Sequence, residues 1–113
     1  MAYGEEHWLG QCKVSFHSAG HVLGSAQIRL EADGEVWVVS GDYKRDDDPS
    51  CEPFEPVGCD VLITEATFGM PIYRWQSGAH VAQEIRNWWT SDPSRPSILF
   101  CYAFGKAQRL LAE

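Results

Sequence analysis

Polar and apolar residues alternate along two stretches of the N-terminal half, and a third stretch is apolar throughout. The alternation over residues 12–17 and again over residues 25–31 predicts two half-buried strands, because successive side chains of a strand point to opposite faces. Residues 36–40 (VWVVS) are apolar on both faces and predict a central strand. Asp33 and Gly34 between the last two stretches are typical of a two-residue turn, so these two strands are expected to form a hairpin.

The second half of the chain predicts strands alternating with helices. Residues 60–64 (DVLIT) and 97–102 (SILFCY) are short apolar runs that predict buried strands. Residues 79–90 predict a helix whose single apolar stripe includes Trp88 and Trp89. Because the two tryptophans share that stripe with aliphatic residues, a place in the hydrophobic core is favoured over a role as a base-stacking platform.

The two ends of this pattern suggest an incomplete domain. The strand predicted over residues 12–17 has no partner upstream, and the last predicted helix, Lys106 to Glu113, ends the chain within a β-α unit. Sheets with long unpaired edges are marginally stable at best. We therefore expect a fragment rather than a self-sufficient domain.

Composition narrows the classes of function without selecting one. The formal net charge of −7 and a pI of about 4.9 argue against a nucleic-acid module that binds through bulk electrostatics, since such modules carry a basic face. They do not argue against an enzyme that holds phosphates with a metal and a few placed cations. No apolar run reaches the ~18 residues that span a bilayer, and the start lacks the features of a signal peptide. We expect a cytoplasmic protein with no membrane partner.

Cysteines and the acidic run have simple interpretations. The four cysteines show no CxxC spacing, so neither a zinc knuckle nor a disulfide scaffold is expected. Cys12 and Cys101 lie in predicted strands, as reduced core thiols do. Residues 46–48 are three consecutive aspartates and are most simply a solvated loop, because three adjacent side chains cannot all point at one ion.

Two histidines followed by an aspartate carry the strongest suggestion of chemistry. His21 lies in AGHVLG and Asp42 in SGDY, and the predicted hairpin brings both loops to the same end of the sheet. Neutral imidazole and carboxylate are common ligands of first-row metals. His17 lies four residues before His21, but Gly20 and Gly24 indicate a loop rather than a helix. A loop histidine held by ordinary contacts explains His21 equally well on local sequence.

Four further residues are candidates for supporting roles. Glu65 directly follows the apolar run DVLIT, a position typical of functional loops and equally of acidic surface residues. Lys106 lies at a strand-to-helix turn, where free backbone N–H groups near Gly105 can receive a phosphate. Lys44 and Arg45 could also contact a phosphate. For these three basic residues, exposed solubilising side chains are the simpler interpretation.

Several motifs in one order carry a resemblance to a known family. AGHVLGSA, SGDY, TEATFG and AFGKAQRLL occur in the order and at the separations of the β-CASP group of metallo-β-lactamase fold nucleases. Longer sequence segments are most similar to the bacterial ligase-associated DNA exonucleases, also described as mRNA 3′-end processing factor-like. These segments extend from YGE near the start through CDVLITEATFGMPIYRW to YAFGKAQRLL. The resemblance covers nearly the whole chain.

This resemblance implies a fold and a set of site residues. The fold would be α/β, with residues 1–70 forming the C-terminal side of a partial αββα metallo-β-lactamase sandwich and residues 71–113 beginning an inserted β-CASP α/β domain. His21 would bind a catalytic zinc, Asp42 would bridge two metals and act in catalysis, and Glu65 would be a catalytic residue that supports the metal ligands. The implied cofactors are two divalent metal ions, zinc or else manganese.

An activity and partners are implied as well. The resemblance indicates a hydrolase of phosphodiester bonds, a DNA exonuclease in ligase-associated repair, with nucleic acid, a DNA ligase and a helicase as partners. The alternative is an RNA 3′-end processing nuclease of the same fold. Small-molecule metallo-hydrolases fit this sequence less well, because they lack the TEATFG segment that leads into an inserted domain.

The departures from the family pattern lead to a further expectation. The HxHxDH motif would lie upstream of Met1 and the later histidine motifs beyond Glu113, while His17 has no ligand role in the pattern. Two ligands do not hold a dinuclear site, so the 113-residue chain by itself is expected to be inactive. The non-enzymatic alternative is a truncated piece that acts only as an interaction module.

Overall fold

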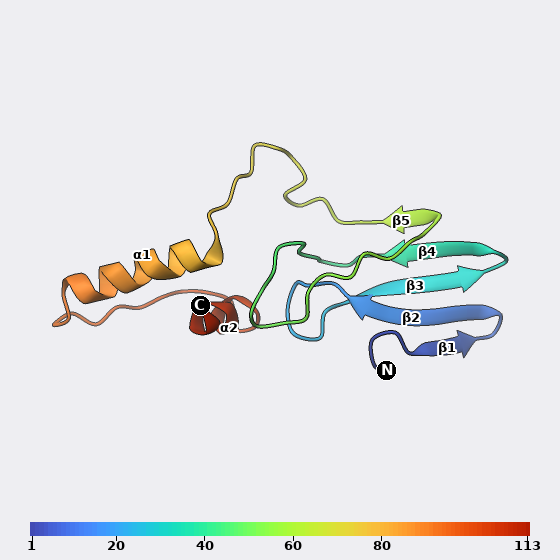
Figure 1. Ribbon diagram of the computed structural model, residues 1–113, viewed down its shortest axis with the longest axis horizontal. Coiled ribbons are helices and arrows are strands. Elements are labelled where there is room, and N and C mark those ends of the chain that lie inside the picture. The colour runs from blue at the N-terminus through green and yellow to red at the C-terminus, as the bar shows by residue number, and fades with distance from the viewer. The chain divides into compact units, whose positions relative to one another are not determined.

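The computed structural model describes residues 1–113, the whole of the chain. A five-stranded sheet is followed by two helices (Figure 1), which confirms the α/β class. The chain divides into two units, Met1–Thr67 with the sheet and Phe68–Glu113 with the helices.

Each strand of the sheet pairs with its neighbour in the sequence. The first four strands are antiparallel, whereas β5 lies parallel to β4. All four strands predicted in the first 64 residues are present, with ends shifted by no more than one residue. The last of them is not buried as predicted, since Leu62 and Ile63 are 56% and 50% exposed at the edge of the sheet. In order across the sheet the strands are β1 (Glu6–Leu9), β2 (Cys12–Ser18), β3 (Ala26–Ala32), β4 (Glu35–Val39) and β5 (Val61–Ile63).

β1 overturns the expectation that the strand starting at Cys12 has no upstream partner. Glu6 pairs with Ser15, and Leu9 with Cys12, across a turn that contains Gly10. The whole of β1 is exposed. Its sequence, EHWL, has no apolar face, so hydrophobic periodicity could not identify it.

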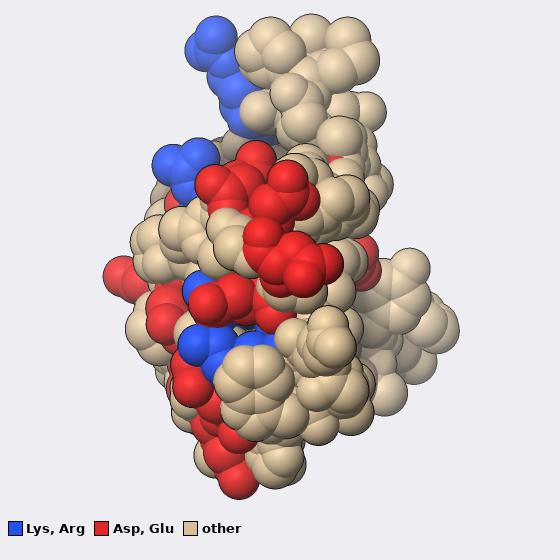
Figure 2. All heavy atoms as spheres, turned by 90° about the vertical axis from the view of Figure 1, so that its right-hand side faces the viewer, with Lys and Arg blue, Asp and Glu red and all other residues tan.

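The turn between β3 and β4 has the conformation that its sequence predicts. Asp33 and Gly34 both have positive φ, 52° and 81°, which matches the right-handed twist of the flanking strands. Ala32 pairs with Glu35, so the turn is tight. Seen from this end of the sheet (Figure 2), Asp and Glu side chains gather in a band with fewer Lys and Arg among them.

The core of the sheet unit is small and partly polar. Its buried apolar residues are Val14, Ala19 and Val38. Four polar side chains are equally buried, and their hydrogen bonds help to fix the loops that follow the strands. These residues are Ser15, Ser18, Gln27 and Ser40.

Both predicted helices are present in the second unit, as α1 (Gly78–Ser91) and α2 (Lys106–Ala112). The Ser77 side chain caps α1 by accepting a hydrogen bond from His80 N at 3.3 Å. Neither helix has the length and apolar character needed to cross a membrane.

Three expectations for this unit are wrong. Trp88 and Trp89 are exposed rather than core residues, because α1 has no sheet within its unit to bury its stripe. The segment 97–102 forms no strand, since no neighbouring strand completes its hydrogen bonds, and Phe100 is 94% exposed. Cys101 is therefore exposed as well. All four cysteines are free thiols.

Candidate metal centre at the sheet edge

Three loops that carry predicted site residues leave the sheet at the same edge. β2, β4 and β5 run in one direction, because β3 is antiparallel to both β2 and β4 and β5 is parallel to β4. Their C-terminal ends therefore lie together (Figure 1). His21 follows β2, Asp42 follows β4 and Glu65 follows β5.

His21 and Asp42 approach one another at this edge. His21 Nε2 lies 3.9 Å from Asp42 Oδ2, and their side chains are 45% and 75% exposed. This separation is too long for a direct hydrogen bond. The structure therefore brings together the two residues that the sequence pairs, with both donor atoms accessible from solvent.

Backbone hydrogen bonds to Ser25 shape the His21 loop. The backbone N–H groups of His21 and Val22 both donate to Ser25 Oγ at 3.1 Å, and Ala19 N donates to Ser25 O at 3.0 Å. The Tyr3 hydroxyl also donates to Ser25 O, at 2.8 Å. Burial, followed by the nearby Glu52 carboxylate, raises the pKa of the Tyr3 phenol above its ordinary value. Sequence reasoning assigned no role to Tyr3.

Gly20 allows the loops after β2 and β4 to pack closely. It has a φ of +65°, and a Cβ there would collide with Lys44 O and lie 2.8 Å from Phe54 N. Lys44 N donates to Ala19 O at 3.0 Å, and Cys51 Sγ donates to Gly20 O at 3.5 Å. The loop that carries Asp42 is thereby tied to the loop that carries His21.

A network of polar residues beneath these loops was not predicted. The Gln27 side-chain amide donates to Ser18 O at 3.0 Å and to Glu55 O at 2.6 Å, and Glu55 N donates to Ser18 O. His17 Nδ1 lies 2.8 Å from Glu55 Oε1, and its Nε2 lies 2.9 Å from Ser15 Oγ. Both ring nitrogens of His17 thus have protein partners, so His17 is a structural residue here.

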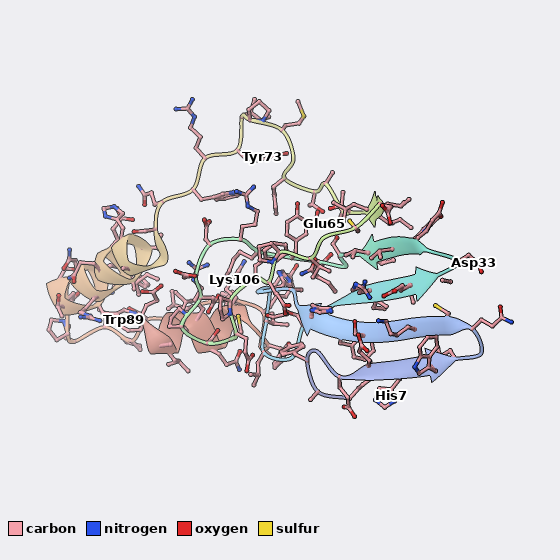
Figure 3. All side chains as sticks on the ribbon, turned by 45° about the vertical axis from the view of Figure 1, so that its right-hand side comes forward. His7, Asp33, Glu65, Tyr73, Trp89 and Lys106 are labelled. Atoms are coloured by element: carbon pink, nitrogen blue, oxygen red, sulfur yellow. The ribbon has the colours of Figure 1, made fainter.

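Glu65 lies at the same edge but makes its contacts within its own loop. Its Oε2 accepts a hydrogen bond from Thr67 N at 2.6 Å, which stabilises the turn that follows β5 (Figure 3). The preceding Thr64 is joined to the end of β4 by a 3.4 Å contact between its hydroxyl and that of Ser40. Glu65 therefore fixes the exit from β5 rather than contacting His21 or Asp42.

The three basic candidates have different surroundings. Lys44 forms an ion pair with Asp48, whose side chain is only 4% exposed, so Asp48 is not part of a merely solvated loop. Arg45 is exposed. Lys106 lies 5.3 Å from the centre of the Tyr102 ring.

Two of the backbone N–H groups at the start of α2 have partners within the chain, unlike the free groups expected near Gly105. Gly105 N donates to the Gln108 side chain at 2.7 Å, and Ala107 N donates to Tyr102 O at 3.2 Å. These two N–H groups are therefore not open to a phosphate.

The donors at the sheet edge fit part of a metal centre. No group of three or more His, Cys, Asp or Glu side chains converges in the structure. Two ligands that bind one ion tetrahedrally at about 2.0–2.2 Å are about 3.4 Å apart. The 3.9 Å separation of His21 Nε2 and Asp42 Oδ2 is close to this value, and a small side-chain rotation would close the difference.

Comparisons with known proteins identify relatives among nucleic-acid enzymes. The chain is 36% identical to a "Probable DNA ligase" of Opitutus terrae over all of its length, 32% identical to an "RNase J-like protein" of Methanocaldococcus jannaschii over 96%, and 35% identical to "Cleavage and polyadenylation specificity factor subunit 3" of Dictyostelium discoideum over 88%. It spans 12%, 27% and 13% of the length of these relatives. No family model matches the chain.

These relatives and the motif set define the class of protein. The chain is homologous to a segment of the β-CASP group of metallo-β-lactamase fold nucleases.

Proposed function

We propose that this chain forms the part of a metal-dependent nuclease that carries one histidine and one aspartate ligand, and that the enzyme degrades DNA ends in ligase-associated repair. The 3.9 Å approach of His21 Nε2 to Asp42 Oδ2 is the observation that carries the proposal. In this proposal residues 1–70 belong to the αββα metallo-β-lactamase core and residues 71–113 begin the inserted β-CASP domain.

The proposed roles follow from the chemistry of each group. His21 would hold a divalent ion through Nε2, and Asp42 would help to hold this ion and a second one through its carboxylate. Such ions, zinc or manganese, supply Lewis acidity toward water and toward the phosphoryl oxygens. Ser25 fixes the His21 loop through its hydroxyl, and Glu65 fixes the exit from β5, so both hold the ligands in position.

Two donors do not complete such a centre, so further ligands must come from elsewhere in the whole protein. We infer that the 113-residue chain alone neither retains metal nor cleaves nucleic acid. Arg45 is the basic side chain at this edge best suited to contact a substrate phosphate, because Lys44 is paired with Asp48.

DNA as the substrate is supported by the relative that is named a DNA ligase, which matches the chain over all of its length. The name of the same relative supports a DNA ligase as a partner. We include a helicase partner and a cytoplasmic location in the proposal on the motif resemblance alone. An RNA 3′-end processing nuclease is the alternative, supported by the names of the archaeal and Dictyostelium relatives.

Metal analysis combined with strand cleavage tests the proposal. In the protein expressed from its full natural reading frame, we expect His21→Ala and Asp42→Ala each to lower cleavage of end-labelled DNA by more than about a hundredfold. Loss of a group that only orients a ligand already costs about 10–100-fold. Bound zinc and manganese, measured by mass spectrometry, should fall in both variants.

A second histidine–carboxylate pair in the chain provides the matched control. His80 Nε2 lies 3.5 Å from Glu84 Oε1 on α1, and both side chains are exposed. His80→Ala should leave metal content and cleavage unchanged. The proposal would be abandoned if the unaltered protein bound neither metal and left end-labelled DNA and RNA intact.

A further inference from the structure

Three aromatic side chains form a cluster just before α1. The aromatic cluster consists of Phe68, Tyr73 and Trp75. The Tyr73 and Trp75 rings are parallel within 3°, with centroids 6.3 Å apart. Phe68 packs edge-on against both, at 5.1 Å and 5.3 Å. Figure 3 shows Tyr73 on the irregular segment that precedes α1.

These rings hold one another in place while remaining open to solvent. Trp75 is 71% exposed, and Phe68 and Tyr73 are exposed too. Aromatic pairs favour offset stacked and edge-to-face geometries, so the mutual contacts stabilise the ring orientations. The result is a preformed apolar surface with flat ring faces, which would cost little conformational entropy on binding a flat ligand.

Charge around the cluster favours an anionic partner. No Asp or Glu occurs between Glu65 and Glu84, although the chain as a whole carries 16 of them. Arg74 lies between the two stacked residues in the sequence. The segment is thus locally basic in an acidic chain and contrasts with the acidic band at the hairpin end of the sheet (Figure 2).

We propose that the aromatic cluster stacks against unpaired bases of a single-stranded nucleic acid, with Arg74 contacting its backbone phosphate. Every base presents a π-face, so ring stacking needs no particular sequence, and a nearby cation retains the phosphate. This inference rests on the proposed function for the identity of the partner as nucleic acid. It adds a base-binding surface formed by residues other than His21 and Asp42.

Fluorescence anisotropy with a labelled 15-nucleotide oligothymidine tests this inference. The measurement uses the protein from its full natural reading frame without divalent metal, so that the strand stays intact. We expect Trp75→Ala to weaken binding between about fivefold and about a hundredfold, the range that stacking of one base covers. Trp75→Phe keeps a ring and should recover most of the affinity. A labelled oligouridine measured in parallel shows whether the surface accepts RNA as well.

An equally exposed tryptophan on β1 serves as the matched control. Trp8 is 67% exposed, and Trp8→Ala should leave binding unchanged. A strand of abasic nucleotides should bind weakly and respond little to Trp75→Ala. A cooperative unfolding transition, measured by circular dichroism, verifies that the Trp75→Ala variant is folded.

The outcomes separate this inference from the proposed function. Equal affinities of Trp75→Ala and the unaltered protein would overturn the inference, as would an equal loss with the abasic strand or a protein that binds no oligothymidine. If Trp75→Ala weakens binding but the unaltered protein cleaves no strand in the presence of metal, the stacking surface stands and the nuclease proposal fails. Capture of a protein partner without strand binding would also overturn the inference.

Discussion

Gly20 lies where the loop after β2 meets the backbone of two later segments. Its φ of +65° belongs to the left-handed region, and the direction in which a Cβ would point is filled by Lys44 O and Phe54 N. Glycine is thus required here both by the backbone conformation and by the space available. The close approach lets Lys44 N reach Ala19 O and sets the spacing of the His21 and Asp42 loops.

Gly20→Ala should destabilise the sheet unit strongly. A left-handed alanine costs about 1–2 kcal/mol, and forcing a methyl group against rigid backbone adds about 1–3 kcal/mol. We therefore expect the free energy of unfolding, measured in urea, to fall by about 2–5 kcal/mol.

A matched control separates these two effects. Gly24 has a similar φ of +77°, but nothing lies within 4 Å of its Cβ position. Gly24→Ala should show only the backbone cost of about 1–2 kcal/mol. If the free energy of unfolding fell equally in the two variants, the close backbone contact at Gly20 would contribute nothing to the effect of Gly20→Ala.

At the scale of elements, hydrophobic alternation and turn chemistry were sufficient to predict β2, β3, β4 and the turn between the last two. They also placed His21 and Asp42 at one edge, because a tight turn fixes the register of the whole hairpin. β1 was missed because its four residues are all exposed and have no apolar face. The segment 97–102 was assigned wrongly, since an apolar run becomes a strand only beside a partner.

The supporting network escaped prediction for a related reason. Gln27 alternates with Ala26 and Ile28, so its pattern is that of a solvent-facing strand residue. The structure instead leaves it 2% exposed, under a segment that arrives 28 residues later in the chain. Contacts between segments so distant in sequence leave no local periodic signal. The aromatic cluster was missed because it lies in an irregular segment.

Gln27→Ala should loosen the connection between β3 and the segment that contains Glu55. The substitution removes the hydrogen bonds that the Gln27 amide donates to the carbonyls of Ser18 and Glu55, and only Ser18 O keeps another donor, Glu55 N. Losing hydrogen bonds to buried groups costs about 1–3 kcal/mol. We expect a decrease of that size in the free energy of unfolding, measured by urea denaturation.

Gln11→Ala is the corresponding control. Gln11 is exposed in the turn between β1 and β2, so its truncation should change stability by less than about 0.5 kcal/mol. If Gln27→Ala were as mild as Gln11→Ala, the network would not hold the loop segments together.

At the scale of the whole molecule, a net charge of −7 makes acid stability depend on individual carboxylates. Burial of Asp48 raises the pKa of its carboxyl, but hydrogen bonds from Lys44 and Ser50 outweigh this effect and bring the pKa from 3.8 to about 2. Hydrogen bonds from Arg29 and Lys13 also lower the pKa of Glu31.

Asp48→Asn should therefore alter the pH profile of stability. A folded-state pKa below the unfolded value stabilises the fold above about pH 4, and this contribution is lost as the pH falls toward 2. It amounts to about 2 kcal/mol, since one pKa unit corresponds to about 1.4 kcal/mol. The unaltered chain should lose this amount between pH 4 and pH 2, measured as the free energy of unfolding in urea.

The variant should be less stable at pH 6 and show a flatter profile. Asp47→Asn, a change at the exposed neighbouring residue, should keep the steep profile. A profile for Asp48→Asn that matched the unaltered one would contradict the assignment of acid sensitivity to this carboxylate.

The tight turn at Asp33 and Gly34 lies at the opposite end of β4 from Asp42, and Figure 3 shows Asp33 at the tip of the hairpin, well away from Glu65. Both turn residues are exposed, and a Cβ at Gly34 would meet nothing within 4 Å. This tip is consequently a natural anchoring point for surface immobilisation. A molecule tethered there would leave the edge that carries His21 and Asp42 open to the bulk solution, which suits single-molecule measurement of ligand binding at that edge.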